Sequence, residues 1–425
     1  MSVTRRLSVA VVARAVMPLH GVGGLERSVH DLVRHLAARG VNVTMIVPPA
    51  HQVRRPTTAD PFASPNIRIR HVSYLSFPLA NRRGTTILDR STAYPLYGWR
   101  AGRLARELAN EGAVDIVHGF GASVLGAAGM TAPLVMNPQG LEEFGATAGR
   151  LPALKHAGYA PLRWAVRRVA SRAACVIATD VSLESTVVRH LQPAAGRLRT
   201  IPNGIDLVDA GALAGPADGL LTRQRHGIGS GEIVFVSVGR LELNKGFDLM
   251  PAALARASAA GSTLAAAGWR WVLIGSGPYR AAIERQVAAH RLEPHVIVAG
   301  RTNERDLHAW YEAASVFVHP TRYEGSSLVT LEAMAHRQPI IATVAGGLPD
   351  KVHPGVNGWL VEPNDVEGLA RAIADAASSP TRLVSMGAKS REIVEREFAW
   401  TVLVEKYLSL YQELLDGPRL SQPGP

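Results

Sequence analysis

The sequence lacks several features that are each typical of a particular class of protein. It has one cysteine, Cys175, among 425 residues, which excludes an intramolecular disulfide framework and a cysteine-rich zinc site. No apolar run approaches the roughly 18 residues of a membrane-spanning helix. The first residues imitate a secretory signal, but Arg14 interrupts the apolar run LSVAVVA. We therefore interpret that run as a buried strand and expect a cytoplasmic protein.

Metal-binding and disordered classes are also disfavoured. Charged residues make up 19% of the chain and hydrophobic ones 47%, enough apolar side chains to fill large cores. The histidines are scattered, and no DxD motif lies near the end of an expected strand, so we predict no metal site. The length corresponds to two or three domains at roughly 150 residues each.

Lysine is scarce, with only five among the 46 basic residues. The positive charge is also unevenly distributed along the chain. Residues 1–205 hold 25 basic residues against 11 acidic ones, a net charge of +14, whereas residues 206–425 hold 21 against 24, a net charge of −3. A basic half of a protein can bind nucleic acid, an anionic membrane surface or an acidic substrate. The arginines are spread along the chain without interleaved aromatic residues, which disfavours nucleic acid. We favour docking to an anionic membrane or a phosphorylated lipid-linked acceptor.

Short apolar runs alternate with helical patterns along the chain. LSVAVV is followed by apolar positions at helical spacing over 25–39 and then by VNVTMIV. The rhythm continues to CVIAT, breaks in the Gly- and Ala-rich stretch near 205–230, and restarts at IVFVSVG. This pattern predicts two Rossmann-like α/β domains with mostly parallel sheets, joined by a linker in that stretch. Ligands of such sheets bind beyond the carboxyl ends of the strands, so two facing domains would hold two substrates between them.

Glycine-rich motifs follow the expected strands of the second half. In SVGRLELNKG, Gly239 turns the chain, and Arg240 and Lys245 emerge together as two cations suited to a diphosphate. Two solvated surface bases are the alternative. WVLIGSGP places Gly275 at another strand end, where either a ligand approaches the backbone or the chain merely turns. AGGLPD, after the strand IIAT, would place main-chain N–H groups beside the same ligand.

The stretch TRYEGSSLVTLEAMA carries two carboxylates, Glu324 and Glu332, eight residues apart. A helix that begins near Ser326 and Ser327 offers free N–H groups and the positive end of its dipole to a phosphate. Glu324 would hang over that site, and Glu332 can accept two hydrogen bonds from a diol such as ribose. The alternative is a capping arrangement followed by a solvated helix glutamate.

The first half carries weaker motifs. PLHGVGGLE places Gly23 and Gly24 where a phosphate-cradling loop precedes a helix. Its spacing is not GxGxxG, and no acidic residue ends the second strand, which argues against NAD. DIVHGFG puts His118 at a strand end, where an imidazole can position or deprotonate a hydroxyl or serve as a hydrogen-bonded structural residue. The helix APLRWAVRRVASRAAC would present arginines and Trp164 to anionic lipid headgroups or simply to solvent.

In their order and spacing, GVGGLE, GRLELNKG, GSGP, the two glutamates with seven residues between them, AGGLPD and NGWLVEP resemble the retaining glycosyltransferases of family 4, which have the GT-B fold. The resemblance covers nearly the whole chain. It implies an acceptor domain at 1–205, a sugar-nucleotide donor domain at 206–398 and a closing helix at 399–416 that crosses back to the first domain. The composition of the last residues, GPRLSQPGP, predicts a flexible tail at 417–425.

The resemblance also implies an activity. A sugar would pass from a nucleotide-diphosphate sugar, most often a UDP-sugar, to a hydroxyl of a glycan, glycolipid or lipid-linked acceptor in cell-envelope or polysaccharide synthesis. The anomeric configuration would be retained by a front-face reaction. No cofactor or metal is expected, because cationic side chains and helix dipoles take the place of a metal. A sugar-nucleotide 2-epimerase of the same architecture and a basic nucleic-acid-binding protein are the alternatives.

The functional residues of the family map onto this chain residue by residue. Catalytic roles fall on Arg240 and Lys245 at the diphosphate, on Glu324 at the sugar hydroxyls and on His118. Donor contacts fall on Gly23, Gly24, Gly239, Gly275, Gly300, Arg301, Ser326, Ser327, Leu328 and Glu332. Phe120 stands where many members have a second histidine, so the role of that missing imidazole is open.

Overall fold

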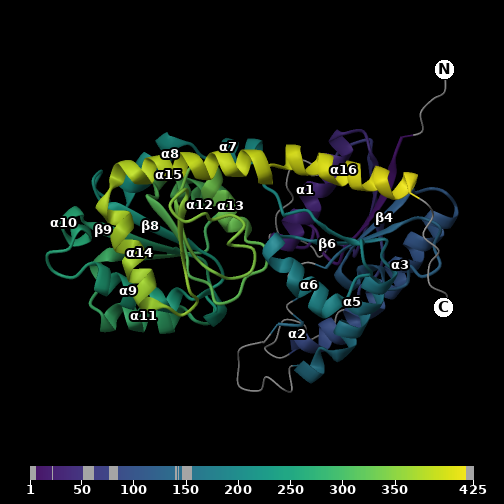
Figure 1. The fold of residues 1–425 in the computed structure, drawn as a ribbon, viewed down its shortest axis with the longest axis horizontal. Helices are drawn as coiled ribbons and strands as arrows, with labels where there is room; N and C mark the ends of the chain where they lie inside the picture. Colours follow the sequence, from purple (N-terminus) through teal and green to yellow (C-terminus); the bar gives the residue numbers. More distant parts are fainter. Residues whose placement is uncertain are drawn as a thin grey trace. The chain divides into compact units, whose positions relative to one another are not determined.

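The computed structural model describes residues 6–21, 23–50, 62–75, 85–138, 141, 143–145 and 156–417. The chain divides into two compact units (Figure 1): unit 1 consists of Met1–Asn203 and Trp400–Pro425, and unit 2 consists of Gly204–Ala399. Each unit is built around a parallel sheet, as the alternation of strand and helix patterns predicts. The predicted class of two Rossmann-like α/β sheets is confirmed.

Unit 1 has a seven-stranded sheet in the order β3-β2-β1-β4-β5-β6-β7, and every neighbouring pair is parallel. The strands are β1 (Ser8–Val12), β2 (Asn42–Val47), β3 (Ile67–His71), β4 (Ile116–Phe120), β5 (Leu134–Asn137), β6 (Cys175–Ala178) and β7 (Leu198–Thr200). The helices are α1 (Gly24–Ala38), α2 (Thr85–Leu88), α3 (Tyr94–Asn110), α5 (Ala160–Arg172), α6 (Glu184–Leu191) and α16 (Trp400–Asp416).

Helices cover both faces of the unit 1 sheet. On one face, α3 and α5 close a core that is rich in alanine, and on the other α1 and α16 close a core of larger side chains (Figure 1). The last helix, α16, is therefore part of unit 1 although it follows the whole of unit 2 in sequence. Its first residue, Trp400, stacks on His35 of α1 with ring centroids 5.7 Å apart. Arg39 and Glu405 form an ion pair at 2.9 Å beside that contact.

Unit 2 has a six-stranded sheet in the order β10-β9-β8-β11-β12-β13, again parallel throughout. The strands are β8 (Ile233–Val238), β9 (Trp269–Ile274), β10 (Val296–Gly300), β11 (Val316–His319), β12 (Ile340–Thr343) and β13 (Gly358–Val361). The helices are α7 (Leu207–Leu213), α8 (Pro216–Arg225), α9 (Met250–Ala257), α10 (Thr263–Ala267), α11 (Arg280–Ala289), α12 (Glu304–Ala313), α13 (Leu328–Ala335), α14 (Val366–Ser378) and α15 (Pro380–Ile393). Apolar cores lie on both faces of this sheet as well.

The stretch 205–230 differs from the irregular linker that its composition predicts. It forms α7 and α8, which belong to unit 2, and the Asp206 carboxylate caps the first N–H groups of α7. A Cβ on Gly219 of α8 would lie 2.6 Å from the carbonyl carbon of Glu312 in α12, so the two helices lie in close contact. The apolar periodicity is weak because α8 buries small residues, Gly219 and Thr222, in place of large apolar ones.

Two remaining expectations concern the tail and the membrane. The predicted tail at 417–425 lies, apart from Gly417, outside the described residues. Within the described ranges, no helix combines the length and the apolarity that crossing a membrane requires.

Candidate functional site

Three side chains converge beyond the carboxyl ends of β8 and β11. Lys245 lies in the loop after β8, His319 is the last residue of β11, and Glu324 lies in the loop that leads to α13. Lys245 Nζ is 2.8 Å from Glu324 Oε2, and His319 Nε2 is 2.7 Å from the same oxygen. We call these three residues the Glu324 cluster. It joins a cation, a carboxylate and an imidazole from two neighbouring strand ends.

The charge states of the Glu324 cluster follow from its surroundings. Burial opposes ionisation of Glu324, but the Lys245 ammonium and the His319 hydrogen bond outweigh it and hold the pKa of Glu324 well below its usual range. Burial lowers the pKa of His319, against the opposing effect of Glu324. At neutral pH the imidazole is therefore neutral. Because a carboxylate only accepts hydrogen bonds, the proton of His319 is assigned to Nε2.

Close backbone contacts fix the two loops that carry this cluster. Gly246 has φ +69°, and a Cβ there would lie 1.8 Å from the carbonyl oxygen of Pro320. The N–H of Arg322 donates to the carbonyl of Asn244 at 2.7 Å. The loop of Lys245 is thus held directly against the segment that precedes Glu324, and only glycine fits at position 246.

The predicted helix after Glu324 begins where the sequence indicates. Ser327 is the N-cap of α13, its side chain accepts from the N–H of Thr330, and Leu328 is the first helical residue. Ser326 Oγ accepts a hydrogen bond from Lys351 Nζ at 3.3 Å. The Lys351 side chain is fully buried and also donates to the carbonyl of Gly347. This lysine ties the turn before α13 to the AGGLPD segment.

Glu332 lies in the second turn of α13 and differs from the solvated glutamate of the alternative interpretation. Its side chain is buried, and its Oε2 accepts a hydrogen bond from the Tyr311 hydroxyl at 2.9 Å. Tyr311 comes from the neighbouring helix α12. The Tyr311 contact holds one carboxylate oxygen of Glu332 at a defined position.

Arg240 is placed differently from Lys245. Its Nη1 lies 2.9 Å from Glu242 Oε1, and its side chain is 66% exposed. The structure therefore groups Lys245 with Glu324 and pairs Arg240 with a carboxylate of its own loop. The two cations of SVGRLELNKG do not share a partner among the described residues.

Three of the predicted glycines lie together at the ends of adjacent strands. A Cβ on Gly275 would lie 1.9 Å from the carbonyl oxygen of Gly239, and the N–H of Gly275 donates to the carbonyl of Gly300 at 2.8 Å. These contacts hold the carboxyl ends of β8, β9 and β10 close together. Arg301, which follows Gly300, is exposed.

In unit 1, Gly23 and Gly24 lie at the start of α1. Gly23 is the N-cap, and Gly24 is the first helical residue. A Cβ on Gly23 would lie 2.4 Å from Glu26 Oε2, so the Glu26 carboxylate folds back over the beginning of the helix. Glu26 therefore interacts favourably with the positive end of the α1 dipole.

His118 is fully buried within unit 1. Its Nδ1 lies 2.6 Å from the hydroxyl oxygen of Tyr411 in α16, and its ring stacks on Phe120 with centroids 5.1 Å apart. Burial lowers the pKa of His118 to about 3. Its Nε2 is buried without a hydrogen-bond partner among the described residues. This environment favours the structural alternative, a neutral histidine that anchors α16, over a catalytic imidazole.

Some members of the site are absent from the sequence-based prediction. His319 reads as the end of a buried strand, and the signal that could have identified it is the one used for His118, a histidine at a carboxyl strand end. Lys351 could have been noticed as one of only five lysines. In the part of the chain that the structure describes, no group of three or more His, Cys, Asp or Glu side chains is placed to hold a metal ion.

Comparison with protein families identifies the chain. Residues 221–393 match the model of the glycosyl transferases group 1, and residues 22–209 match that of glycosyltransferase family 4. The chain belongs to glycosyltransferase family 4. This family 4 enzyme is a glycosyltransferase of the EC 2.4 class and transfers a sugar from a nucleotide sugar. The predicted family is thereby confirmed.

Relatives of this family 4 enzyme have diverse activities. It is 27% identical over 416 residues to a glycogen synthase from Mycobacterium tuberculosis, covering 95% of this chain and 94% of that protein. It is 31% identical over 219 residues to a GDP-mannose-dependent monoacylated alpha-(1-6)-phosphatidylinositol monomannoside mannosyltransferase from Corynebacterium glutamicum, covering 50% of this chain and 55% of that protein.

Solved structures of glycosyltransferases share its fold. Sucrose-phosphate synthase from Thermosynechococcus elongatus matches with a TM-score of 0.74 and 25% identity, over 96% of this chain and 99% of that one. HepE from Anabaena, solved in complex with UDP, matches with a TM-score of 0.68 and 18% identity, over 96% and 100% of the two chains. The predicted GT-B fold is confirmed by these matches.

Proposed function

We propose that this glycosyltransferase moves a sugar from a UDP-sugar to a hydroxyl of a glycan, glycolipid or lipid-linked acceptor used in cell-envelope or polysaccharide synthesis, with retention at the anomeric carbon and without a metal. The observation that carries the proposal is the Glu324 cluster. It fixes an ammonium and a partly buried carboxylate 2.8 Å apart, in the loop that leads to α13. The ammonium can bind a diphosphate, and the carboxylate beside it can accept hydrogen bonds from the hydroxyls of the attached sugar.

Each residue of the donor site has a physical role in this proposal. Lys245 stabilises the negative charge that builds up on the departing diphosphate. The N–H groups of Ser326, Ser327 and Leu328 bind phosphate oxygens at the positive end of α13. Glu324 stays ionised because its pKa is low, so it accepts hydrogen bonds from sugar hydroxyls.

The remaining donor contacts are arranged around this centre. The second oxygen of Glu332 accepts from the ribose diol. Arg240, which is exposed, exchanges Glu242 for the diphosphate when the donor binds. The closely spaced strand ends at Gly239, Gly275 and Gly300 leave backbone exposed to the nucleotide, and Arg301 contacts the base.

The chemical step is a front-face substitution. The acceptor oxygen forms a bond to the anomeric carbon while the bond from that carbon to the leaving phosphate oxygen breaks on the same face. The acceptor proton passes to the leaving phosphate oxygen, so the products are a glycoside and a nucleoside diphosphate. No side chain is assigned as a covalent nucleophile, and the barrier is lowered mainly by charges that are already in place.

Three observations support the proposed donor base, acceptor and location. The UDP complex of HepE supports a UDP-sugar, whereas the mannosyltransferase relatives are GDP-mannose-dependent. The lipid-linked acceptors in the names of those relatives support a glycolipid acceptor. The net charge of +14 in residues 1–205 supports docking to an anionic membrane from the cytoplasm.

The test is incubation of the enzyme with UDP-, GDP- and ADP-sugars in the presence of EDTA, with and without candidate acceptors, followed by NMR of the products. We expect release of UDP and a glycoside with the anomeric configuration of the donor. An inverted product, or a reaction that requires an added divalent metal, would contradict the mechanism. Conversion of the sugar nucleotide into its 2-epimer without acceptor would establish the isomerase alternative.

A further inference from the structure

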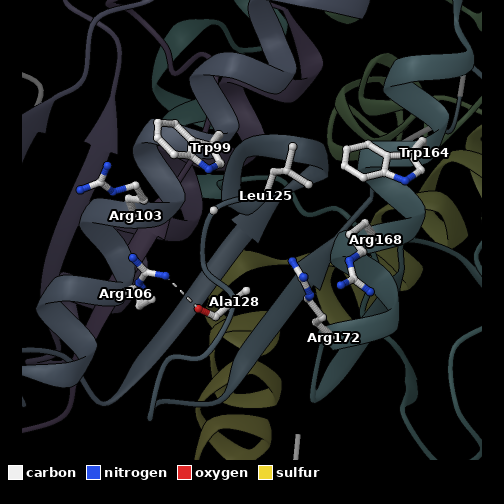
Figure 2. A pocket seen from close by; sticks show the side chains of 9 residues that line it. Trp99, Arg103, Arg106, Leu125, Ala128, Trp164, Arg168 and Arg172 are labelled. Atoms are coloured by element: carbon white, nitrogen blue, oxygen red, sulfur yellow. Dashed lines mark hydrogen bonds between the residues drawn. The ribbon is translucent and has the colours of Figure 1, made fainter. Parts of the chain in front are cut away.

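A pocket of about 490 Å³ opens in unit 1 between α3 and α5 (Figure 2). The α3 wall contributes Trp99, Arg103 and Arg106, and the α5 wall contributes Trp164, Arg168 and Arg172. Figure 2 shows the two indoles at one end of the pocket and the arginines toward the other. We call this cavity the tryptophan–arginine pocket. None of the roles proposed for the donor site involves it.

The order of residues along the two helices produces this polarity. On each helix a tryptophan is followed by an arginine four residues later and by a second arginine one further turn along. Residues three and four apart lie on the same side of a helix, so each helix presents one stripe with an indole at its beginning and two guanidinium groups after it. The two stripes face each other across the pocket (Figure 2).

Glycines shape the floor of the tryptophan–arginine pocket. A Cβ on Gly102 of α3 would lie 2.6 Å from the backbone nitrogen of Gly126, and a Cβ on Gly126 would lie 2.0 Å from the carbonyl oxygen of Trp99. The helix α3 therefore lies directly against the loop that forms the floor. This loop packing fixes the positions from which Trp99 and Arg103 project.

Positive charge in the tryptophan–arginine pocket is largely uncompensated. No carboxylate is found among the described residues that line it. Arg103 meets Glu107 at 3.6 Å on the surface of α3, and Arg106 donates to the carbonyl of Ala128 at 3.2 Å. Arg168 and Arg172 form no ion pair with the described residues. Burial, and then the charge of Arg168, lower the pKa of Arg172, so an anion between the two would relieve an existing repulsion.

The indoles distinguish between a free phosphate and a membrane as the source of that anion. Trp99 is 47% exposed and Trp164 is 61% exposed. A small soluble phosphate on the arginines would leave both rings in water. At a membrane surface, indoles lie favourably at the boundary between headgroups and acyl chains, while arginines are attracted to anionic headgroups.

We propose that the tryptophan–arginine pocket binds the phosphorylated headgroup of an anionic membrane lipid, with the arginines on the phosphate and the indoles at the level of the glycerol backbone. The inference deepens the membrane docking proposed above and rests on it. It assigns the docking to the groove between α3 and α5. The positive charge spread over residues 1–205 does not by itself indicate which surface docks.

Vesicle sedimentation tests the proposal, with vesicles of phosphatidylcholine alone and vesicles that contain about 30% phosphatidylglycerol. We expect the full chain to sediment with the anionic vesicles only. The double variant Arg168→Glu/Arg172→Glu should bind them at least about tenfold more weakly. The matched control is Arg68→Glu/Arg70→Glu, which makes the same charge change at exposed positions of β3 in the same unit. An equal loss in both double variants would overturn the proposal.

Two further readouts identify the ligand and the contact. Glycerol phosphate in solution should not release the protein from the vesicles. Release would indicate that the pocket binds a soluble phosphate, and it would overturn the proposal of a lipid headgroup. Tryptophan emission of the unmodified protein should shift to the blue on vesicle binding, and Trp99→Phe/Trp164→Phe should lose most of that shift. A full shift in this variant would also contradict the proposal.

The same variants are assayed for sugar transfer to a soluble acceptor, which separates this inference from the proposed function. Vesicle binding is measured without donor or acceptor. Failure of vesicle binding would therefore leave the transferase intact, and failure of transfer would leave the vesicle result intact.

Discussion

Unit 1 and unit 2 share a parallel sheet with helices on both faces, yet their charged side chains are arranged differently. Near the candidate site of unit 2, two cations pair with carboxylates: Lys245 with Glu324 at 2.8 Å, and Arg322 with Asp248 through two hydrogen bonds at 2.6 and 2.8 Å. Among the residues that the structure describes, the lining of the tryptophan–arginine pocket of unit 1 includes four arginines and no carboxylate. Paired charges fix the geometry of a site, whereas uncompensated ones attract an anion from outside.

This difference gives the two regions different sensitivities to mutation. A partly buried pair that loses one member leaves the other without compensation, so both the geometry and the chemistry of the unit 2 site should suffer. The arginines of the unit 1 pocket are partly solvated, so their loss should affect binding at a surface and leave the fold intact.

The largest effect is expected for Lys245→Ala. Losing one preorganised electrostatic donor costs on the order of 100- to 1,000-fold in kcat in other enzymes, and we expect a loss of that size in sugar transfer. The matched control is Lys389→Ala, which removes an exposed lysine that pairs with Glu392 at 2.6 Å. Steady-state rates of the two variants test this prediction. Near-normal turnover of Lys245→Ala would show that Lys245 does not contribute to catalysis.

A smaller but specific effect is expected for Gly246→Ala. The substitution introduces strain of about 1–3 kcal/mol at a positive φ and, in addition, a methyl group 1.8 Å from the Pro320 oxygen. Gly355→Ala provides the comparison, because Gly355 has φ +79° and no atom within 4 Å of its Cβ position. Urea unfolding and kcat should both fall more for Gly246→Ala. Equal effects would mean that the contact between the two loops does not support the site.

The buried His118 predicts a pH dependence of stability in unit 1. Unfolded histidine takes up a proton near its ordinary pKa of 6.5, whereas folded His118 does so only near 3. The unfolded state therefore binds more protons between these values, and stability falls as the pH drops from 6.5 towards 3. The Tm of His118→Phe should decline less steeply over that window than the Tm of the unmodified protein. Parallel curves would show that His118 does not stay neutral in the folded state.

The smallest effect is expected for Tyr411→Phe, which removes the hydroxyl bonded to His118 Nδ1. Leaving a buried polar atom unsatisfied should lower the free energy of unfolding by about 1–2 kcal/mol. Tyr279→Phe is the matched control, because the Tyr279 hydroxyl makes no hydrogen bond to the described residues. Chemical denaturation of both variants measures the difference, and equal stabilities would show that α16 is held without this hydrogen bond.

Much of the fold was predictable because most of the parallel strands are short apolar runs and many of them are followed by a helical pattern. The strand β7 and the helix α8 were not, since β7 has only three residues and α8 buries small side chains. Helix α15 likewise buries Gly387 and Ser390 among its larger side chains, which weakens its apolar pattern. Local hydrophobic periodicity therefore predicts an element only where large apolar residues mark its buried face.

The site was predictable as separate motifs but not as an arrangement. Lys245 and Glu324 are 79 residues apart in sequence, and their contact depends on β8 and β11 being neighbours in the sheet. That strand order is not encoded in either motif. The pairing of Arg240 with Glu242 depends on side-chain conformation, which a sequence pattern does not specify. For the same reason the stripes of Trp99 and Trp164 reveal a pocket only once α3 and α5 are placed side by side.

The central claim is that Lys245, held against Glu324, binds the diphosphate of the donor. Calorimetric titration of the unmodified protein and of Lys245→Ala with UDP, in the presence of EDTA, tests it most directly, with GDP and ADP titrated alongside. We expect UDP to bind the unmodified protein, and Lys245→Ala to bind it about 10- to 100-fold more weakly through the loss of a charge-assisted hydrogen bond. Unchanged affinity for UDP in Lys245→Ala would contradict the account.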